Sequence, residues 1–98
     1  MLVPAHVLLR LAVETQSGMK LGRVSGFEFE TEGQVILRYE VRRLLFAAPL
    51  LIHRDQVVMI DATRMVVQDA AVPVELRSRL ETPKSLPEES AATQSRGE

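Results

Sequence analysis

The spacing of apolar residues near the start of the chain is typical of a β-strand. Leu9, Leu11 and Val13 occupy alternate positions, with mostly polar residues between them. A period of two residues places such side chains on one face of an extended strand. We therefore expect a first strand over residues 7–14. The sequence Thr-Gln-Ser-Gly that follows predicts a turn in which Gly18 adopts a positive φ.

A second strand is expected to begin near Lys20. Part-way along it, the side chains that face the core change from even-numbered to odd-numbered positions. Val24 is even-numbered, whereas the aromatic residues Phe27 and Phe29 are odd-numbered. An extra residue in one strand of a pair reverses which positions face inward, and glycine is common at such points. We therefore expect a β-bulge at Gly26, with both phenylalanines in the core.

A run of alternating residues over 35–42 indicates the partner strand of a hairpin, since its odd-numbered positions are all apolar or aromatic. A three-residue loop over 31–33 pairs Phe29 with Val35 and keeps the buried faces of both strands in register. Such a loop needs a left-handed residue at its third position. The pattern therefore predicts a positive φ at Gly33.

Residues 44–52 form a continuous apolar run interrupted by Pro49, which cannot donate to a strand ladder and so belongs at a sheet edge or a strand start. Two further short strands are expected over 57–60 and 65–68. These short strands fit a small β-barrel. A barrel of this size cannot bury both faces of the apolar run, which makes the run a candidate homodimer interface. The alternative is that the apolar side chains of the run all pack into the core and the rim of the barrel. The candidate interface residues are Leu45, Phe46, Leu50 and Leu51.

The composition changes after residue 72. Residues 73–81 are compatible with a short helix, and the rest of the chain is rich in Pro, Ser, Glu and Ala. Such a composition has too few apolar residues to fold on its own. We therefore expect one domain over residues 5–72, followed over 73–98 by a short helix and a disordered tail.

The charge balance disfavours nucleic acid as a direct ligand. Twelve Lys and Arg oppose thirteen Asp and Glu, which gives a net charge of −1 without the basic excess typical of phosphate binding. Arginines 38, 42, 43 and 54 form a candidate basic patch, but Glu28, Glu30 and Glu40 are expected to neutralise much of it. The chain has no cysteine, which fits a reducing cytoplasm, and no apolar run long enough to span a membrane is seen.

The order of these features resembles that of a PRC-barrel domain over roughly residues 6–69. The Gly-x-x-Leu-Gly-x-Val turn that characterises this family is matched by Gly18, Leu21, Gly22 and Val24. A proline before an apolar pair, followed by polar residues and a Val-rich strand, is matched over residues 49–60. The resemblance implies a six-stranded β-barrel that binds other proteins and has no catalytic activity. The chain is most similar to the small stand-alone members of the family.

The spacing of the histidine and aspartate residues does not indicate a catalytic site or a metal site. His6 and His53 are the only histidines, and with Asp55 and Asp61 they do not follow a ligand or acid–base pattern. We therefore expect no catalytic, cofactor or metal residue, and interpret the chain as a cytoplasmic, all-β interaction or assembly module that forms a homodimer. One alternative is a ribosome-maturation accessory that binds a ribosomal protein or RNA, and another is a small enzyme using His53, Asp55 and Asp61. The glycines expected to serve only as structural turn residues are Gly18, Gly22, Gly26 and Gly33.

Overall fold

The computed structural model describes residues 1–43 and 48–74, which form a single six-stranded sheet with the strand order β4-β3-β2-β1-β6-β5. β1 and β6 run parallel, and the other neighbouring pairs are antiparallel. The all-β class is confirmed. In chain order the elements are α1 (Ala5–Leu8), β1 (Ala12–Thr15), β2 (Lys20–Glu30), β3 (Val35–Arg42), β4 (Leu50–His53), the 3₁₀ turn η1 (Arg54–Gln56), β5 (Val57–Ile60), β6 (Arg64–Val67) and the 3₁₀ turn η2 (Asp69–Ala71).

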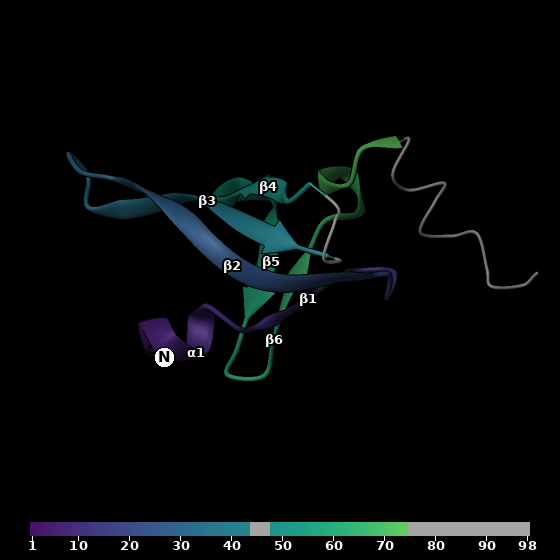
Figure 1. Ribbon diagram of the computed structural model, residues 1–98, viewed down its shortest axis with the longest axis horizontal. Helices are drawn as coiled ribbons and strands as arrows, with labels where there is room; N and C mark the ends of the chain where they lie inside the picture. The colour runs from purple at the N-terminus through teal and green to yellow at the C-terminus, as the bar shows by residue number, and fades with distance from the viewer. Residues whose placement is uncertain (44–47, 75–98) are drawn as a thin grey trace, which may run out of the picture.

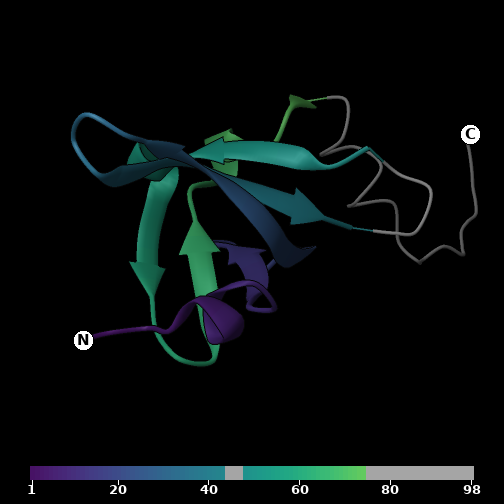
Figure 2. The ribbon, with the colours of Figure 1, turned by 60° about the vertical axis from the view of Figure 1, so that its left-hand side comes forward.

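The sheet is open, so the prediction of a closed barrel was wrong. β4 and β5 form its two edges, and in the described part of the chain they do not pair with each other. The η1 turn joins them, and there the His53 side chain accepts the backbone N–H of Asp55 at 3.0 Å. Because this corner redirects the chain, β5 pairs with β6 instead of with β4. Figure 2 shows β4 crossing near the upper ends of β5 and β6, so the sheet curls without closing.

The curled sheet encloses one core. Its side chains come from α1, from five of the six strands and from the segment after η2, and Val41, Ile52, Met65 and Val67 are fully shielded from solvent. Burying apolar side chains of this kind is the main favourable term in folding. The buried residues of the core are Leu8, Leu11, Val13, Leu21, Val24, Tyr39, Val41, Ile52, Met65, Val67 and Val72.

The first element is a helical turn, so the prediction of a strand over residues 7–14 was wrong for its first half. Pro4 precedes α1, and its carbonyl accepts the N–H groups of Val7 and Leu8 at 3.0 and 2.9 Å. Pro4 is the N-cap residue, with an extended backbone of φ −65° and ψ 155°, and it has no N–H group that would need a partner. Leu8 and Leu11 are buried while Leu9 is exposed. The buried residues of this segment, Leu8 and Leu11, are three positions apart, as in a helical turn, and not two apart as in a strand. The strand begins only at Ala12.

The expected start of the second strand and its bulge are both confirmed. β2 begins at Lys20, and its pairing with β3 skips Ser25 between Val24 and Gly26. The Ser25 hydroxyl donates to the Glu40 carboxylate at 2.7 Å on the outer face. The bulge therefore changes the inward parity of β2 at the position that the sequence indicated.

The loop of the β2–β3 hairpin differs from the prediction. Glu30 pairs with Val35, so the loop covers the four residues 31–34. The positive φ, 57°, belongs to Gln34, and Gly33 has no left-handed conformation. The predicted role of Gly33 was therefore wrong, because one additional loop residue moves the left-handed position along the chain.

A second bulge, at Leu37, changes the register farther along the hairpin. Phe29 pairs with Ile36, and the predicted pairing of Phe29 with Val35 was wrong. Phe27 pairs with the buried Tyr39, so its inward parity is as expected, yet its side chain is 39% exposed and that of Phe29 is 52% exposed. The two phenylalanines lie on the core-facing side of the sheet but outside the core.

The later strands match the sequence pattern. Pro49 immediately precedes the edge strand β4, as expected, and the Val-rich segments form β5 and β6. Residues 44–47, which include Leu45 and Phe46, lie outside the described residues, as do residues 75–98 with the expected helix and tail.

Two glycines of the Gly-x-x-Leu-Gly-x-Val turn have left-handed backbones. Gly18 lies in the β1–β2 turn with φ 93°, as expected, and Gly22 lies within β2 with φ 132°. A Cβ atom at Gly22 would lie 2.2 Å from the Arg42 carbonyl oxygen, whereas one at Gly18 would meet nothing within 4 Å. Only glycine therefore permits β2 to approach β3 at position 22.

We predict that Gly22→Ala lowers the free energy of unfolding by at least about 2 kcal/mol, because both the backbone conformation and the contact with β3 are strained. Gly33→Ala is the matched control and should change it by no more than about 0.5 kcal/mol. Urea denaturation followed by circular dichroism measures both variants. Equal stability of the two variants would show that the close approach at Gly22 is not maintained in solution.

Candidate functional site

The β2–β3 hairpin extends beyond the strands that flank it. β1 pairs with β2 only as far as Arg23, and β4 pairs with β3 only from Arg38 onward. Residues 25–37 therefore form a two-stranded segment, here called the arm, which has no further strand partner among the described residues. Figures 1 and 2 both show its tip reaching past the other strands on the side of the N-terminus.

The arm presents an apolar face and two open edges. Phe27 and Phe29 are half-exposed on one face, and Val35 near the tip is also exposed. Backbone N–H and C=O groups along an unpaired edge are a template for another strand. An isolated two-stranded ribbon is only marginally stable in water, and a partner that covers it supplies the missing contacts. These features are typical of an interaction surface.

The other candidate interface, the apolar run, is described only in part. Leu50 packs against the core, while Leu51 is 56% exposed on β4. β4 is itself an edge strand. Of the four predicted interface residues, Leu51 is exposed on an edge strand and Leu50 is half-buried against the core. Leu45 and Phe46 lie outside the described residues.

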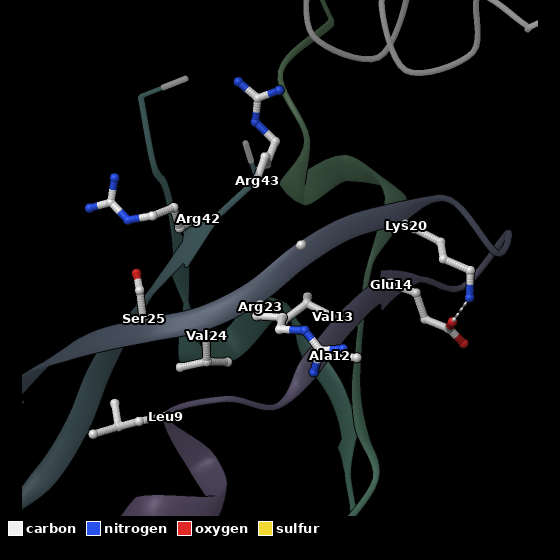
Figure 3. Close-up of a pocket in the computed structure, with 11 residues that line it drawn as sticks. Leu9, Ala12, Val13, Glu14, Lys20, Arg23, Val24, Ser25, Arg42 and Arg43 are labelled. Carbon is white, nitrogen blue, oxygen red and sulfur yellow. Dashed lines mark ion pairs between the residues drawn. The ribbon is translucent and has the colours of Figure 1, made fainter. Parts of the chain in front are cut away.

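A hollow of about 810 Å³ lies at the base of the arm. Figure 3 shows β2 crossing its middle, with Arg42 and Arg43 on one side and Leu9 and Ala12 on the other. Lys20 and Arg23 of β2 also line it. The lining therefore carries four cationic side chains around a partly apolar floor. Its residues are Leu9, Ala12, Val13, Glu14, Lys20, Gly22, Arg23, Val24, Ser25, Arg42 and Arg43.

Two of these cations occupy paired positions on neighbouring strands. Arg23 of β2 is the register partner of Arg42 of β3, and both are exposed on the outer face. The Arg23 guanidinium donates to the Arg10 carbonyl at 2.9 Å, and Arg42 makes no ion pair within the described residues. Like charges directly opposite in a sheet repel each other. In Figure 3 the two guanidinium groups point away from each other, so they leave positive charge at the base of the arm without converging on one point.

Arg43 adds an unsatisfied donor to the same hollow. Its Nε atom is buried and has no hydrogen-bond partner in the part of the chain that the structure describes. A buried donor without an acceptor is costly, and such groups are rare in folded proteins.

The single carboxylate of the hollow is already engaged. Glu14 accepts from the Arg64 guanidinium at 2.6 Å and lies 3.6 Å from the Lys20 ammonium. Its side chain is mostly buried, whereas that of Lys20 is almost fully exposed. Glu14 therefore links β1 to β6 and leaves the positive charge of the arginines uncompensated.

The tip of the arm has the opposite charge. Glu30 and Glu32 are exposed, and neither forms an ion pair in residues 1–43 and 48–74. Glu28, by contrast, binds Arg38 at 2.5 Å, and the two residues are direct register partners on β2 and β3. The basic patch expected from the sequence is thus divided, since Arg38 is neutralised while Arg42 and Arg43 line the hollow. Sequence reasoning missed Arg23, because its position opposite Arg42 depends on the bulge at Ser25.

The residues considered for catalysis have structural partners. His53 holds the η1 turn and lies 3.5 Å from the Asp55 carboxylate. The Asp61 carboxylate accepts from Thr63 and from the Arg64 N–H in the β5–β6 turn, and these hydrogen bonds, chiefly those from Thr63, lower its pKa. Within the described residues there is no group of three His, Asp or Glu side chains that could hold a metal ion. His6 is exposed on α1.

The aromatic hydroxyl of Tyr39 also has a structural explanation. Burial in the core raises its pKa above the ordinary value, and the positive charge of Arg54 opposes this shift more weakly. A phenol with a raised pKa stays neutral at physiological pH. Tyr39 therefore acts as a core residue.

Comparison with known proteins gives no assignment: no protein-family model matches the chain, and no curated protein matches it. Among the helices of the described segments, none has the length and apolar character needed to cross a membrane.

We predict that Glu14→Gln lowers the free energy of unfolding by about 1 kcal/mol, because it removes a partly buried ion pair between β1 and β6. Lys20→Gln should change it by no more than about 0.3 kcal/mol, since Lys20 is solvated. Urea denaturation at low salt compares the two. If Lys20→Gln proves as harmful as Glu14→Gln, the contact with Arg64 is not what stabilises this part of the sheet.

Proposed function

We propose that the chain is a non-catalytic protein-interaction module of PRC-barrel type that assembles as a homodimer in the cytoplasm. The observation that carries the proposal is the arm, which has two half-exposed phenylalanines and open strand edges. Exposed aromatic side chains contribute a large share of binding energy where proteins meet. The described His53 and Asp61 side chains are engaged in turns of the chain.

The size of the protein also favours self-association. A domain of this length buries only about 60% of the surface of its unfolded chain, and its stability is correspondingly modest. Association with a second folded copy adds stability by mass action. A dimer that covers the arm would shield the apolar side chains that the sheet leaves exposed.

The PRC-barrel kinship rests on the order of the elements and on the glycine turn. Gly18 and Gly22 have the left-handed backbones that a glycine-dependent turn requires, and six strands follow the expected order along the chain. The open edge between β4 and β5 departs from the barrel that the resemblance implies. The proposed kinship therefore draws on the order of the elements along the chain and not on a closed barrel.

We predict that the full chain shows a reversible monomer–dimer equilibrium in sedimentation equilibrium, and that Phe27→Ser/Phe29→Ser raises its dissociation constant at least about tenfold, because aromatic contacts are lost. Neither side chain is in the core, so the variant should keep its circular dichroism spectrum.

Val58→Ser is the matched control for this experiment. Val58 is 48% exposed on β5, the opposite edge of the sheet, and its substitution should leave the dissociation constant unchanged. A wild-type chain that remains monomeric at all concentrations contradicts the proposed function. Weakening by Val58→Ser alone would place the interface at β5 and remove the arm from it.

A further inference from the structure

We propose that the edge of β2 in the arm binds an extended segment of a different protein, in which lysine or arginine residues alternate with apolar residues. The edge comprises residues 26–30. The proposed homodimer would cover the apolar face of the arm, whereas the bound segment lies along its edge, so the two contacts are separate.

The edge of β2 is free over these five consecutive residues. β1 and the segment before it occupy this side of β2 only as far as Val24, whose N–H donates to the Leu11 carbonyl at 2.9 Å. On its other side β2 pairs with β3 up to Glu30. Among the described residues no strand continues the ladder past Val24, and Figure 1 shows the arm extending beyond β1. Backbone groups along such an edge can pair with an added strand.

The two faces of this edge differ in chemistry, because alternate side chains of a strand point to opposite faces. Phe27 and Phe29 are half-exposed on the core-facing side. Glu28 and Glu30 are exposed on the outer face. An added strand therefore meets aromatic rings on one face and carboxylates on the other. Apolar residues suit the first face and cations suit the second, which is the alternating pattern proposed for the partner.

The carboxylates make the cations necessary. Glu28 binds Arg38 within the arm, whereas Glu30 forms no ion pair in the part of the chain that the structure describes. The Glu30 carboxylate accepts the Glu32 backbone N–H, at a long 3.5 Å. An added strand displaces water from these carboxylates, and a cation placed across from Glu30 compensates for that loss. Charge complementarity therefore identifies a basic partner strand.

The same charges disfavour a second copy of the chain at this edge. When two β2 edges pair in antiparallel fashion with their phenylalanines on one face, Glu28 and Glu30 of both copies share the other face. Arg38, the cation beside Glu28, is already engaged within its own arm. Like charges side by side in a sheet repel each other. The occupant is therefore a segment of a different protein.

The test measures the binding of a fluorescein-labelled peptide, Thr-Val-Lys-Val-Lys-Val-Thr, to the full chain by fluorescence anisotropy at low ionic strength. One control peptide has glutamate in place of both lysines. A second, Thr-Lys-Lys-Val-Val-Val-Thr, keeps the composition but loses the alternation. A third has N-methyl groups on its five central residues, which remove the donors of a strand ladder. The alternating peptide should bind at least about fivefold more tightly than each control.

Each control can overturn the inference by itself. Equal affinity for the glutamate peptide would show that the charges of the edge do not select the partner. Equal affinity for the non-alternating or the N-methylated peptide would show attraction between charges without strand pairing.

Substitutions in the chain locate the binding site. Glu30→Lys should weaken binding of the alternating lysine peptide at least about fivefold and strengthen binding of the glutamate peptide by a similar factor, because the charge on the edge is reversed. This exchange of preference also shows that the variant is folded. Glu88→Lys is the matched control, with the same charge change in the C-terminal part of the sequence, and should keep the wild-type preference. If Glu30→Lys keeps that preference, or if Glu88→Lys loses it equally, the edge of β2 is not the site.

Sedimentation equilibrium with saturating peptide distinguishes this inference from the proposed function. A homodimer that persists with the peptide bound supports two separate contacts. A homodimer that dissociates as the peptide binds would identify a second copy as the occupant of the edge, which overturns the inference and leaves the proposed function intact. A chain that binds the peptide but never dimerises contradicts the proposed function alone.

Discussion

The difference in length between β1 and β2 governs the rest of the structure. β2 has eleven residues, and β1, its neighbour on one side, has four. β1 covers only the first part of β2, because the residues before it form α1 and cross to the core through Leu8 and Leu11. The remainder of β2 can pair only with β3. The shortness of β1 therefore leaves residues 25–37 as the two-stranded arm. It also leaves Phe27 and Phe29 exposed on the face that a longer neighbouring strand would help to bury.

The same constraint determines where charges meet. At the base of the arm the sheet is four strands wide, and one register row runs from β6 through Ala12 and Arg23 to Arg42. Ala12 also pairs with Arg64 on β6. Glu14 neutralises Arg64 but does not reach the two arginines farther along the row. Gly22 allows the close approach of β2 to β3 immediately beside them. The hollow and its charge are thus consequences of strand register.

The sequence predicted the parts of the fold that depend on local periodicity. The start of β2, the bulge near Gly26, the edge position of Pro49 and the order of the later strands follow from residue parity and from proline and glycine chemistry. Parity also gave the correct face for Phe27, but it cannot reveal whether another strand covers that face. The second bulge at Leu37 has no local signal, because valine, isoleucine and leucine follow one another there and suit either register. The open sheet and the hollow depend on pairing between distant segments, which one sequence does not disclose.

Charges along the arm act against indiscriminate pairing of its open edges. An exposed strand edge with aromatic neighbours would pair with almost any extended chain, and proteins limit this hazard by placing charges along the edge. Glu28 is satisfied by Arg38 within the arm, whereas Glu30 and Glu32 are not. A strand that approaches without cations would bring these carboxylates out of water without compensation, which costs several kcal/mol. The unsatisfied carboxylates therefore act against random pairing of the arm's edges with other extended chains.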